Sequence, residues 1–221
     1  MIKKKSLGQN FLNSPKIIKD IVLAGNVNKD DVVIEIGPGD GILTSELLST
    51  SAHVISVEKD DRLIPLLHQK FRKEISVRQL ELIHADILDL GLPYITSGKY
   101  KVVANIPYYI TGQIIRMFLE SDKQPQSMTI LVQKEVAERI VAKDSKESLL
   151  SLSVKIYGDP KYVMTVGRGL FTPSPNVDSA VLTIENISKD RFSGVGDKLF
   201  FDVIHAGFAH KRKQLLPNLA S

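Results

Sequence analysis

Short apolar runs alternate along the chain with segments whose apolar residues recur every three or four positions. A continuous apolar run of four to eight residues predicts a strand buried on both faces, whereas the longer spacing predicts an amphipathic helix. The first such run, at residues 32–36, is followed by others of similar length and β-branched content. The predicted strands are residues 32–36, 53–57, 80–85, 101–104, 128–132, 162–166 and 180–184.

Helices are predicted between these strands. Ser14 and Pro15 are a favoured N-cap and first residue of a helix that ends near Gly25. Asp60 and Thr111 are likewise predicted to cap the helices that follow them. The other predicted helices cover residues 42–48, 134–141, 149–157 and 198–209. Strands that alternate with helices favour an α/β fold with a doubly wound, mostly parallel, Rossmann-like sheet covered on both faces.

The second half of the chain contains segments without such patterns. Residues 167–175 are too rich in glycine and proline for regular structure, and residues 186–196 are typical of a linker. We therefore predict one main domain at residues 1–186. Residues 187–221 are predicted to be a linker and the start of a small helical part.

Composition adds a bias toward anionic partners. The chain has 221 residues, of which 43% are hydrophobic and 24% charged, as in an ordinary globular protein. Its net charge is +4 and its pI about 9.1, and the excess is concentrated in Lys3–Lys5 and His210–Lys213. Each cluster has an alternative explanation as a merely solvated surface.

The chain contains no cysteine, which excludes a disulfide framework, a thiolate metal site and a cysteine nucleophile. No metal ion is predicted. Lys3–Lys5 is not followed by the apolar segment of a signal peptide, and no apolar stretch is long enough to span a membrane. We therefore expect a cytoplasmic protein without a membrane partner.

Four predicted strands end next to a residue that can bind a ligand: Gly37, Glu58, Asp86 and Asn105. Ligands bind at the carboxyl ends of strands in an open α/β sheet, so these residues are expected to line one crevice. Taken singly, each has a plain structural explanation as a tight turn, a solvated strand end or a helix cap. Their coincidence favours a ligand site.

The glycine loop Gly37-x-Gly39-x-Gly41 lets the backbone approach a ligand where a Cβ would clash. Glu58 lies 17 residues after Gly41 (58 − 41), where a carboxylate can accept from both ribose hydroxyls, and Asp86 can accept from an exocyclic amine. A dinucleotide dehydrogenase is the main competitor. Its fingerprint is Gly-x-Gly-x-x-Gly, however, and the spacing here fits S-adenosylmethionine methyltransferases better.

The tetrapeptide Asn105-Ile106-Pro107-Tyr108 follows the fourth predicted strand. Asn105 offers a carbonyl oxygen, Pro107 stiffens the turn, and Tyr108 offers a flat face for stacking. A planar ring that bears an amine, such as a nucleobase, would suit this set. The alternative is an ordinary turn with a satisfied asparagine and a packed tyrosine.

The sequence as a whole resembles the ribosomal RNA adenine dimethyltransferases, which modify small-subunit ribosomal RNA. The resemblance extends from about residue 7 to residue 219. Its motifs are residues 8–12 (GQNFL), 35–41 (EIGPGDG), 105–110 (NIPYYI), 133–137 (QKEVA) and 171–181 (FTPSPNVDSAV). The last motif favours the small-subunit enzymes over the large-subunit adenine methyltransferases that confer macrolide resistance, which remain an alternative.

The resemblance implies a class I methyltransferase with S-adenosylmethionine as cofactor. It also implies that Asn105, Pro107 and Tyr108 hold the target adenine and that Phe171 closes on its other side. Burial habits alone would instead make Phe171 a core aromatic. The implied cofactor-binding residues are Asn10, Leu12, Gly37, Gly39, Glu58, Asp86 and Asn105.

The implied reaction is dimethylation at N6 of two adjacent adenosines near the 3′ end of small-subunit ribosomal RNA, by a monomer that acts on the pre-30S particle. We expect the Asn105 oxygen and the carbonyl of Ile106 or Pro107 to accept the two N6 protons. This positions the amine without base catalysis. Arg168 and the two terminal basic clusters are the expected phosphate contacts.

Two other classes of function stay open. A non-catalytic ribosome-assembly factor would bind the particle without turnover. A DNA N6-adenine methyltransferase carries Asn/Asp-Pro-Pro-Tyr, where this chain has Ile106 in place of the first proline. Members of the resembling family normally continue beyond the segment that matches residues 208–219, so the C-terminal helical part is expected to be incomplete.

Overall fold

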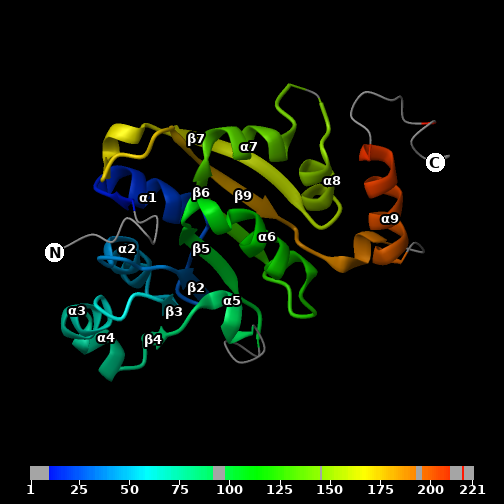
Figure 1. The fold of residues 1–221 in the computed structure, drawn as a ribbon. Coiled ribbons are helices and arrows are strands. Elements are labelled where there is room, and N and C mark those ends of the chain that lie inside the picture. The colour runs from blue at the N-terminus through cyan, green and yellow to red at the C-terminus, as the bar shows by residue number, and fades with distance from the viewer. Residues whose placement is uncertain (1–9, 92–97, 145, 193–195, 210–215, 217–221) are drawn as a thin grey trace.

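A single mixed sheet forms the centre of the computed structural model, which describes residues 10–91, 98–144, 146–192, 196–209 and 216. The strands are β1 (Phe11–Leu12), β2 (Val32–Ile36), β3 (His53–Glu58), β4 (Leu80–His84), β5 (Lys101–Asn105), β6 (Ser127–Gln133), β7 (Asp159–Val166), β8 (Phe171–Thr172) and β9 (Ser179–Glu185). Seven of them form the sheet in the order β4-β3-β2-β5-β6-β9-β7 (Figure 1). Within this sheet β9 alone runs opposite to the other strands, so the predicted mostly parallel sheet is confirmed.

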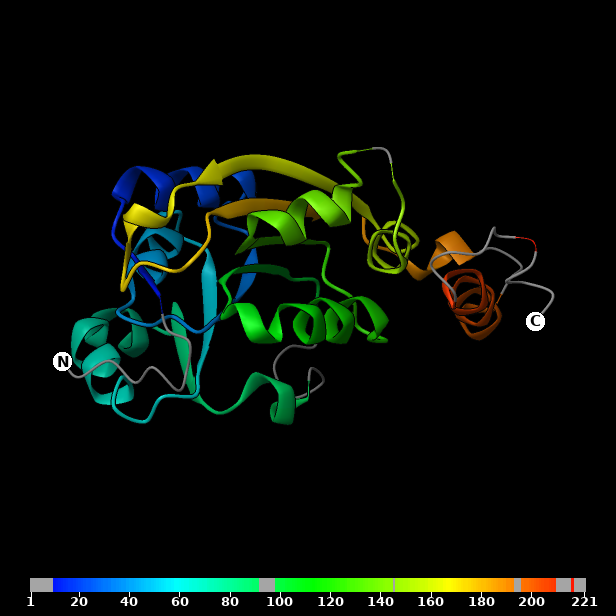
Figure 2. The same cartoon turned by 45° about the horizontal axis from the view of Figure 1, so that its top comes forward.

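Helices cover both faces of this sheet (Figure 2). They are α1 (Pro15–Ala24), α2 (Ile42–Ser49), α3 (Ile64–Lys70), α4 (Arg72–Ser76), α5 (Ile87–Leu90), α6 (Thr111–Glu120), α7 (Lys134–Val141), α8 (Leu149–Lys155) and α9 (Asp197–Phe208). In the described part of the chain, 3₁₀ turns lie at Tyr108–Ile110, Arg168–Leu170 and Lys189–Phe192. The strand and helix centres predicted from the sequence agree with these positions.

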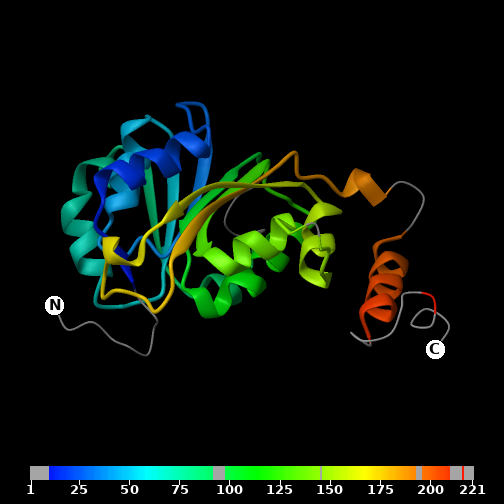
Figure 3. The same cartoon turned by 90° about the horizontal axis from the view of Figure 1, so that it is seen from above.

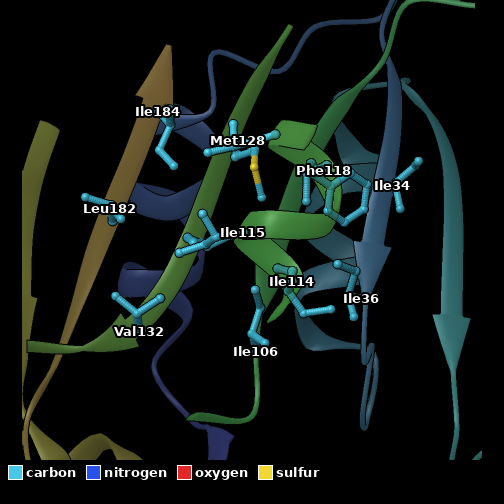
Figure 4. Close-up of a cluster of buried hydrophobic side chains, with 14 of the residues drawn as sticks. Ile34, Ile36, Ile106, Ile114, Ile115, Phe118, Met128, Val132, Leu182 and Ile184 are labelled. Atoms are coloured by element: carbon cyan, nitrogen blue, oxygen red, sulfur yellow. The ribbon is translucent and has the colours of Figure 1, made fainter. Parts of the chain in front are cut away.

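Alternation along β2 separates two cores, because successive side chains of a strand face opposite sides of the sheet. Ile34 and Ile36 point toward α6, where Ile114 and Phe118 fill the same core (Figure 4). Val33 faces the other core, with the buried residues of α1, α2 and α3. Fully burying each such side chain contributes about 1.5–3 kcal/mol, so this two-sided burial fixes the register of the central strands.

Two predicted helix caps are wrong. Asp60 binds the backbone N–H of Arg62 at 3.1 Å and pairs with its guanidinium, so it forms a local turn, and α3 begins only at Ile64. Thr111 is the first residue of α6 rather than its cap, and its buried hydroxyl has no hydrogen-bond partner in the described part of the chain. The 3₁₀ turn at Tyr108–Ile110 leads directly into α6, so Thr111 already has a helical backbone conformation and cannot be the N-cap.

The prediction that residues 167–175 lack regular structure is partly wrong. The segment contains a 3₁₀ turn and then β8, which pairs with β1 in an antiparallel register of Phe11 with Thr172 and Leu12 with Phe171. Neither two-residue strand has a periodic pattern long enough to be read from the sequence. Their pairing joins segments about 160 residues apart and depends on the tertiary fold.

The helix α9 lies beyond the end of the sheet, on the side away from α1 and α2 (Figure 3). It packs on α8 and on Tyr157, which follows α8; the ring centroids of Phe201 and Tyr157 are 6.2 Å apart. The division at residue 186 follows the end of β9 at Glu185 and stays a prediction. Within the described segments, no helix has the length and apolar character needed to cross a membrane.

Replacing Gly41 by alanine should destabilise the protein. Gly41 has φ +76°, and a Cβ there would lie 2.6 Å from Cε2 of the buried Phe71. Left-handed strain and overpacking together should cost about 3 kcal/mol in the free energy of unfolding, measurable by urea titration. The matched control is Gly112→Ala in α6, where an added Cβ meets nothing within 4 Å. That control should be stabilised by about 0.5–1 kcal/mol; equal effects of the two substitutions would contradict the packing described here.

Candidate active site

The predicted strand-end residues meet at the edge of the sheet where β2 and β5 lie side by side and the strand order reverses. Such a switch point opens a crevice, because the connections from the two strands leave toward opposite faces. A cleft of about 410 Å³ opens there, lined by Gly37, Glu58, Asp86 and Pro107. A second pocket of about 50 Å³ is lined by Asn10, Phe11, Gly39 and Asn105–Tyr108. Pro107 borders both.

Glu58 ties the glycine loop to the end of β3. Its Oε2 accepts from the backbone N–H of Gly39 at 3.2 Å, and its Oε1 accepts from the N–H of Asp60 at 2.7 Å. Burial raises the pKa of Glu58, whose side chain nevertheless borders the large cleft. A carboxylate oxygen has a second lone pair, so both oxygens can still accept from a ligand.

Asp86 lies on the cleft wall as the cap of α5. Its Oδ1 accepts from the N–H of Leu88 at 3.0 Å, and its Oδ2 accepts from Nζ of Lys59 at 2.5 Å. The Lys59 hydrogen bond lowers the pKa of Asp86. Lys59 was not predicted as a site residue. It directly follows Glu58 at the strand end, which is the signal that could have found it.

Asn105 lies in the smaller pocket with its amide orientation fixed. Nδ2 donates to the carbonyl of Asn10 at 3.3 Å, and an oxygen in that place could not donate. Oδ1 is therefore the acceptor of this side chain, and no described residue donates to it. Ile106 is 1% exposed and points into the core beside Ile36 and Ile114 (Figure 4), which anchors the tetrapeptide.

Tyr108 is half-buried on the 3₁₀ turn after Pro107. Its hydroxyl is 2.5 Å from Oγ of Ser179, the first residue of β9. Burial raises the pKa of Tyr108, so the phenol stays protonated at neutral pH. Tyr109, which is 64% exposed, lines the larger cleft with Lys59 and was also missed from the sequence.

Two predicted site residues lie in the core rather than open to a pocket. Leu12 is 3% exposed and Phe171 is 4% exposed, and both belong to the cluster that packs against α1 and α2. Leu12 can therefore reach a ligand only through its backbone. Phe171 presents no open ring face in this conformation. The pairing of β1 with β8 explains both positions, since it holds the two residues opposite each other.

The predicted phosphate contacts are only partly described. Lys3–Lys5 and His210–Lys213 lie outside the described residues. Arg168 is exposed, and its backbone N–H donates to Oδ1 of Asp178 at 3.0 Å while its guanidinium donates to the carbonyl of Asn176 at 3.3 Å. This places Arg168 beside the segment that leads to Ser179 and hence on the same edge as Tyr108.

Glu35 is a buried carboxyl that the sequence reading did not single out. Its Oε2 accepts from Thr44 Oγ1 at 2.7 Å and Ser56 Oγ at 2.6 Å, whereas Oε1 has no partner among the described residues. Burial raises the pKa of Glu35 to about 7. The two hydroxyls thus tie α2 and β3 to β2 directly beneath the glycine loop.

The cleft fits an adenosyl group joined to an amino acid. Gly37 has φ +67°, and an added Cβ there would meet no atom within 4 Å, so the loop leaves open space at the cleft. Glu58 and Asp86 supply acceptors for hydroxyl and amine donors. Together with the strand order, in which the single antiparallel strand β9 lies between β6 and β7, these features define a class I S-adenosylmethionine-dependent methyltransferase.

The chain belongs to the ribosomal RNA adenine dimethylase family, whose sequence profile matches residues 2–221. A relative from Dehalococcoides mccartyi, "Ribosomal RNA small subunit methyltransferase A", is 45% identical over 219 residues, which cover 98% of this chain and 74% of the relative. The fold is similar to that of the 23S rRNA methyltransferase ErmE, with a TM-score of 0.83, 27% identity, and 96% of this chain and 84% of that chain covered. A dimethyladenosine transferase from Plasmodium falciparum gives a TM-score of 0.82 at 29% identity, covering 96% and 75% of the two chains.

Glu35 should make stability depend on pH. Its pKa is about 7 in the folded protein against 4.5 as the ordinary value, so the unfolded chain loses this proton first as the pH rises. The free energy of unfolding should therefore fall by about 3 kcal/mol between pH 4.5 and pH 7 on account of this group. Urea titrations across this range would show the decline in the wild type and a decline smaller by about 3 kcal/mol in Glu35→Gln, where only the part from Glu58, whose pKa is also raised, remains. Glu81→Gln, which removes an exposed carboxylate of β4, is the control and should keep the full decline; an equal decline in Glu35→Gln and the wild type would contradict the assignment.

Proposed function

We propose that the chain transfers methyl groups from S-adenosylmethionine to N6 of two adjacent adenosines near the 3′ end of small-subunit ribosomal RNA, within the pre-30S particle. The observation that carries this proposal is the position of Asn105-Ile106-Pro107-Tyr108 where a nucleoside-sized cleft and a smaller pocket share Pro107. The small-subunit assignment is supported by the 45% identity with a small-subunit methyltransferase, against 27% with a 23S rRNA methyltransferase.

The cofactor would lie in the larger cleft. Glu58 would accept from the ribose hydroxyls, and Asp86 would accept from the exocyclic amine of the adenine, between Ile36 and Ile87. The amino-acid end would reach the loop at Gly37 and Gly39. Asn10 and Asn105 would contact it from the smaller pocket, and Leu12 would contribute through its backbone alone, since its side chain is buried.

The two acceptors for the target amine would be Oδ1 of Asn105 and the carbonyl of Ile106. The Pro107 carbonyl already accepts from the N–H of Ile110 at 3.2 Å. No hydrogen bond within the described segments reaches the Ile106 carbonyl, which is therefore the better of the two carbonyls predicted from the sequence. Its position is fixed by the buried Ile106 side chain.

These acceptors would explain the chemistry without a strong base. The bound cofactor supplies an electrophilic methyl group on a sulfonium. Adenine N6 is a weak nucleophile because its lone pair is delocalised into the ring. Accepting both N6 protons favours a pyramidal nitrogen whose lone pair can point along the line of attack. In this proposal Asn105 and Ile106 orient the amine, and the methylated amine then loses its extra proton to solvent.

Stacking would hold the target base once it has left its own stack. Tyr108 borders the smaller pocket and would supply one face, worth about 1–3 kcal/mol. Phe171 would supply the other face only after leaving its buried position between β1 and the core, so we propose that segment as the part that rearranges on RNA binding.

Asn105→Ala should separate chemistry from cofactor affinity. We expect turnover to fall by about 10²–10³-fold, as for loss of one preorganised transition-state contact, because N6 loses one acceptor. The dissociation constant for S-adenosylmethionine should change by less than about threefold, since the acceptors in the larger cleft remain. Single-turnover methyl transfer and isothermal calorimetry measure the two effects, and equal losses in both would rule out the proposed role.

Asp86→Ala should show the opposite pattern. Removing the acceptor for the adenine amine leaves a donor unpaired and should weaken S-adenosylmethionine binding by about tenfold. At saturating cofactor, turnover should stay within about threefold of wild type. A large loss of turnover with unchanged affinity would place Asp86 in the catalytic pocket instead.

Labelled methyl transfer to unmodified small subunits, with separation of the product nucleosides, tests the function itself. Dimethyladenosine in small-subunit RNA is the expected product. Transfer to large-subunit RNA alone would favour the macrolide-resistance type. If the protein binds the cofactor and the particle but transfers no methyl group, an assembly factor would be favoured. Such a factor would not need acceptors directed at N6.

A further inference from the structure

Stacking on a base does not explain why residue 108 carries a hydroxyl group. A phenylalanine would present the same flat face to a base, yet this chain carries a phenol whose oxygen lies 2.5 Å from Oγ of Ser179. A half-buried phenol normally requires a hydrogen-bond partner. Ser179 itself is fully buried, at 0% exposure, so its hydroxyl depends on that of the half-buried Tyr108 for a partner.

Ser179 is the more firmly held of the two residues. It begins β9, where its backbone lies opposite Gln133 of β6 on one side and Val166 of β7 on the other. The preceding Asp178 is also fixed, since its carbonyl accepts from the N–H of Lys134 at 3.0 Å and its side chain accepts from the N–H of Arg168 at 3.0 Å. The serine hydroxyl is therefore a rigid anchor.

Tyr108, in contrast, lies on a three-residue 3₁₀ turn outside the sheet. The first side-chain torsion of a tyrosine chooses among staggered rotamers, and the backbone alone does not select one of them. The Tyr108 oxygen lies on the axis of the Cβ–Cγ bond, so its hydrogen bond to Ser179 fixes this first torsion and with it the place of the ring. It also places the ring relative to Asn105 and Ile106, which are joined to it through the rigid Pro107.

We propose that Ser179 is a positioning residue for methyl transfer, which holds the Tyr108 ring at the place where a target base stacks while Asn105 orients its amine. This inference rests on the proposed function and adds a residue to it. Burial keeps the phenol protonated, so the bond is present throughout the neutral pH range. The bond also links the base pocket to the segment that carries Phe171, eight residues before Ser179 (179 − 171).

A double-mutant cycle of Tyr108→Phe, Ser179→Ala and the combined variant tests this role. Each single substitution removes the same hydrogen bond while keeping the ring. We expect kcat on unmodified small subunits to fall by about tenfold in each, because the base is less often aligned for reaction. The KM for the particle should stay within about twofold, since phosphate contacts dominate RNA affinity, and cofactor affinity should not change.

The combined variant distinguishes positioning from a merely structural role. If both hydroxyls act only through their mutual bond, the double variant loses no more than either single variant. Losses that multiply, or singles that equal the wild type, would overturn the inference. Tyr108→Phe leaves β9 untouched, so a folding defect confined to Ser179→Ala cannot produce a false positive.

The matched control is Tyr162→Phe, which removes a similar bond to Thr165 Oγ1 at 2.6 Å on the exposed side of β7. It should retain wild-type kcat; a tenfold loss there would overturn the link to the pocket. Failure of the proposed function can be distinguished from failure of this inference, because in the first case the wild type itself would transfer no methyl group.

Discussion

The register of the parallel strands is the constraint on which the candidate site depends. Backbone hydrogen bonds set Ile36 beside Val57 and Glu58 beside His84, and they set Asn105 beside Leu131. A slip by one residue would turn every following side chain to the other face of the sheet. Burial on both faces of β2, β3 and β5 makes such a slip costly. The same apolar packing that stabilises the fold therefore holds the cleft-lining groups at one edge.

Three contacts then link this edge to segments that are distant in the sequence. β1 pairs with β8, and the Asn10 carbonyl accepts from Asn105, so the N-terminal segment is attached to the tetrapeptide. Ser179 attaches the other end of the 171–179 segment to Tyr108. The smaller pocket, lined by Asn10, Phe11, Gly39 and Asn105–Tyr108, is thus linked to the 171–179 segment at both ends of that segment. Rearrangement of the segment that bears Phe171 would therefore affect both the β1–β8 pairing and the Ser179–Tyr108 bond.

Two carboxyl groups, those of Glu35 and Glu58, are buried beneath the glycine loop. Glu35 is fully buried with two hydroxyl donors, and burial raises its pKa to about 7, whereas Glu58 uses its oxygens to hold backbone N–H groups of the loop and of Asp60. Burying a carboxyl costs free energy unless it is hydrogen-bonded. The hydroxyl and backbone donors reduce that cost without cancelling it, since the pKa of each carboxyl is still raised, and the site gains a fixed loop next to the cleft.

The sequence by itself determined the parallel sheet, the strand-end positions of Gly37, Glu58, Asp86 and Asn105, and the family, because apolar periodicity and short motifs are local properties of the chain. It could not determine the pairing of β1 with β8, the burial of Leu12 and Phe171, or the bonds made by Lys59 and Ser179. Each of these features depends on contacts between residues that are far apart in the sequence. Their partners are chosen by the assembled fold, and no local pattern encodes them.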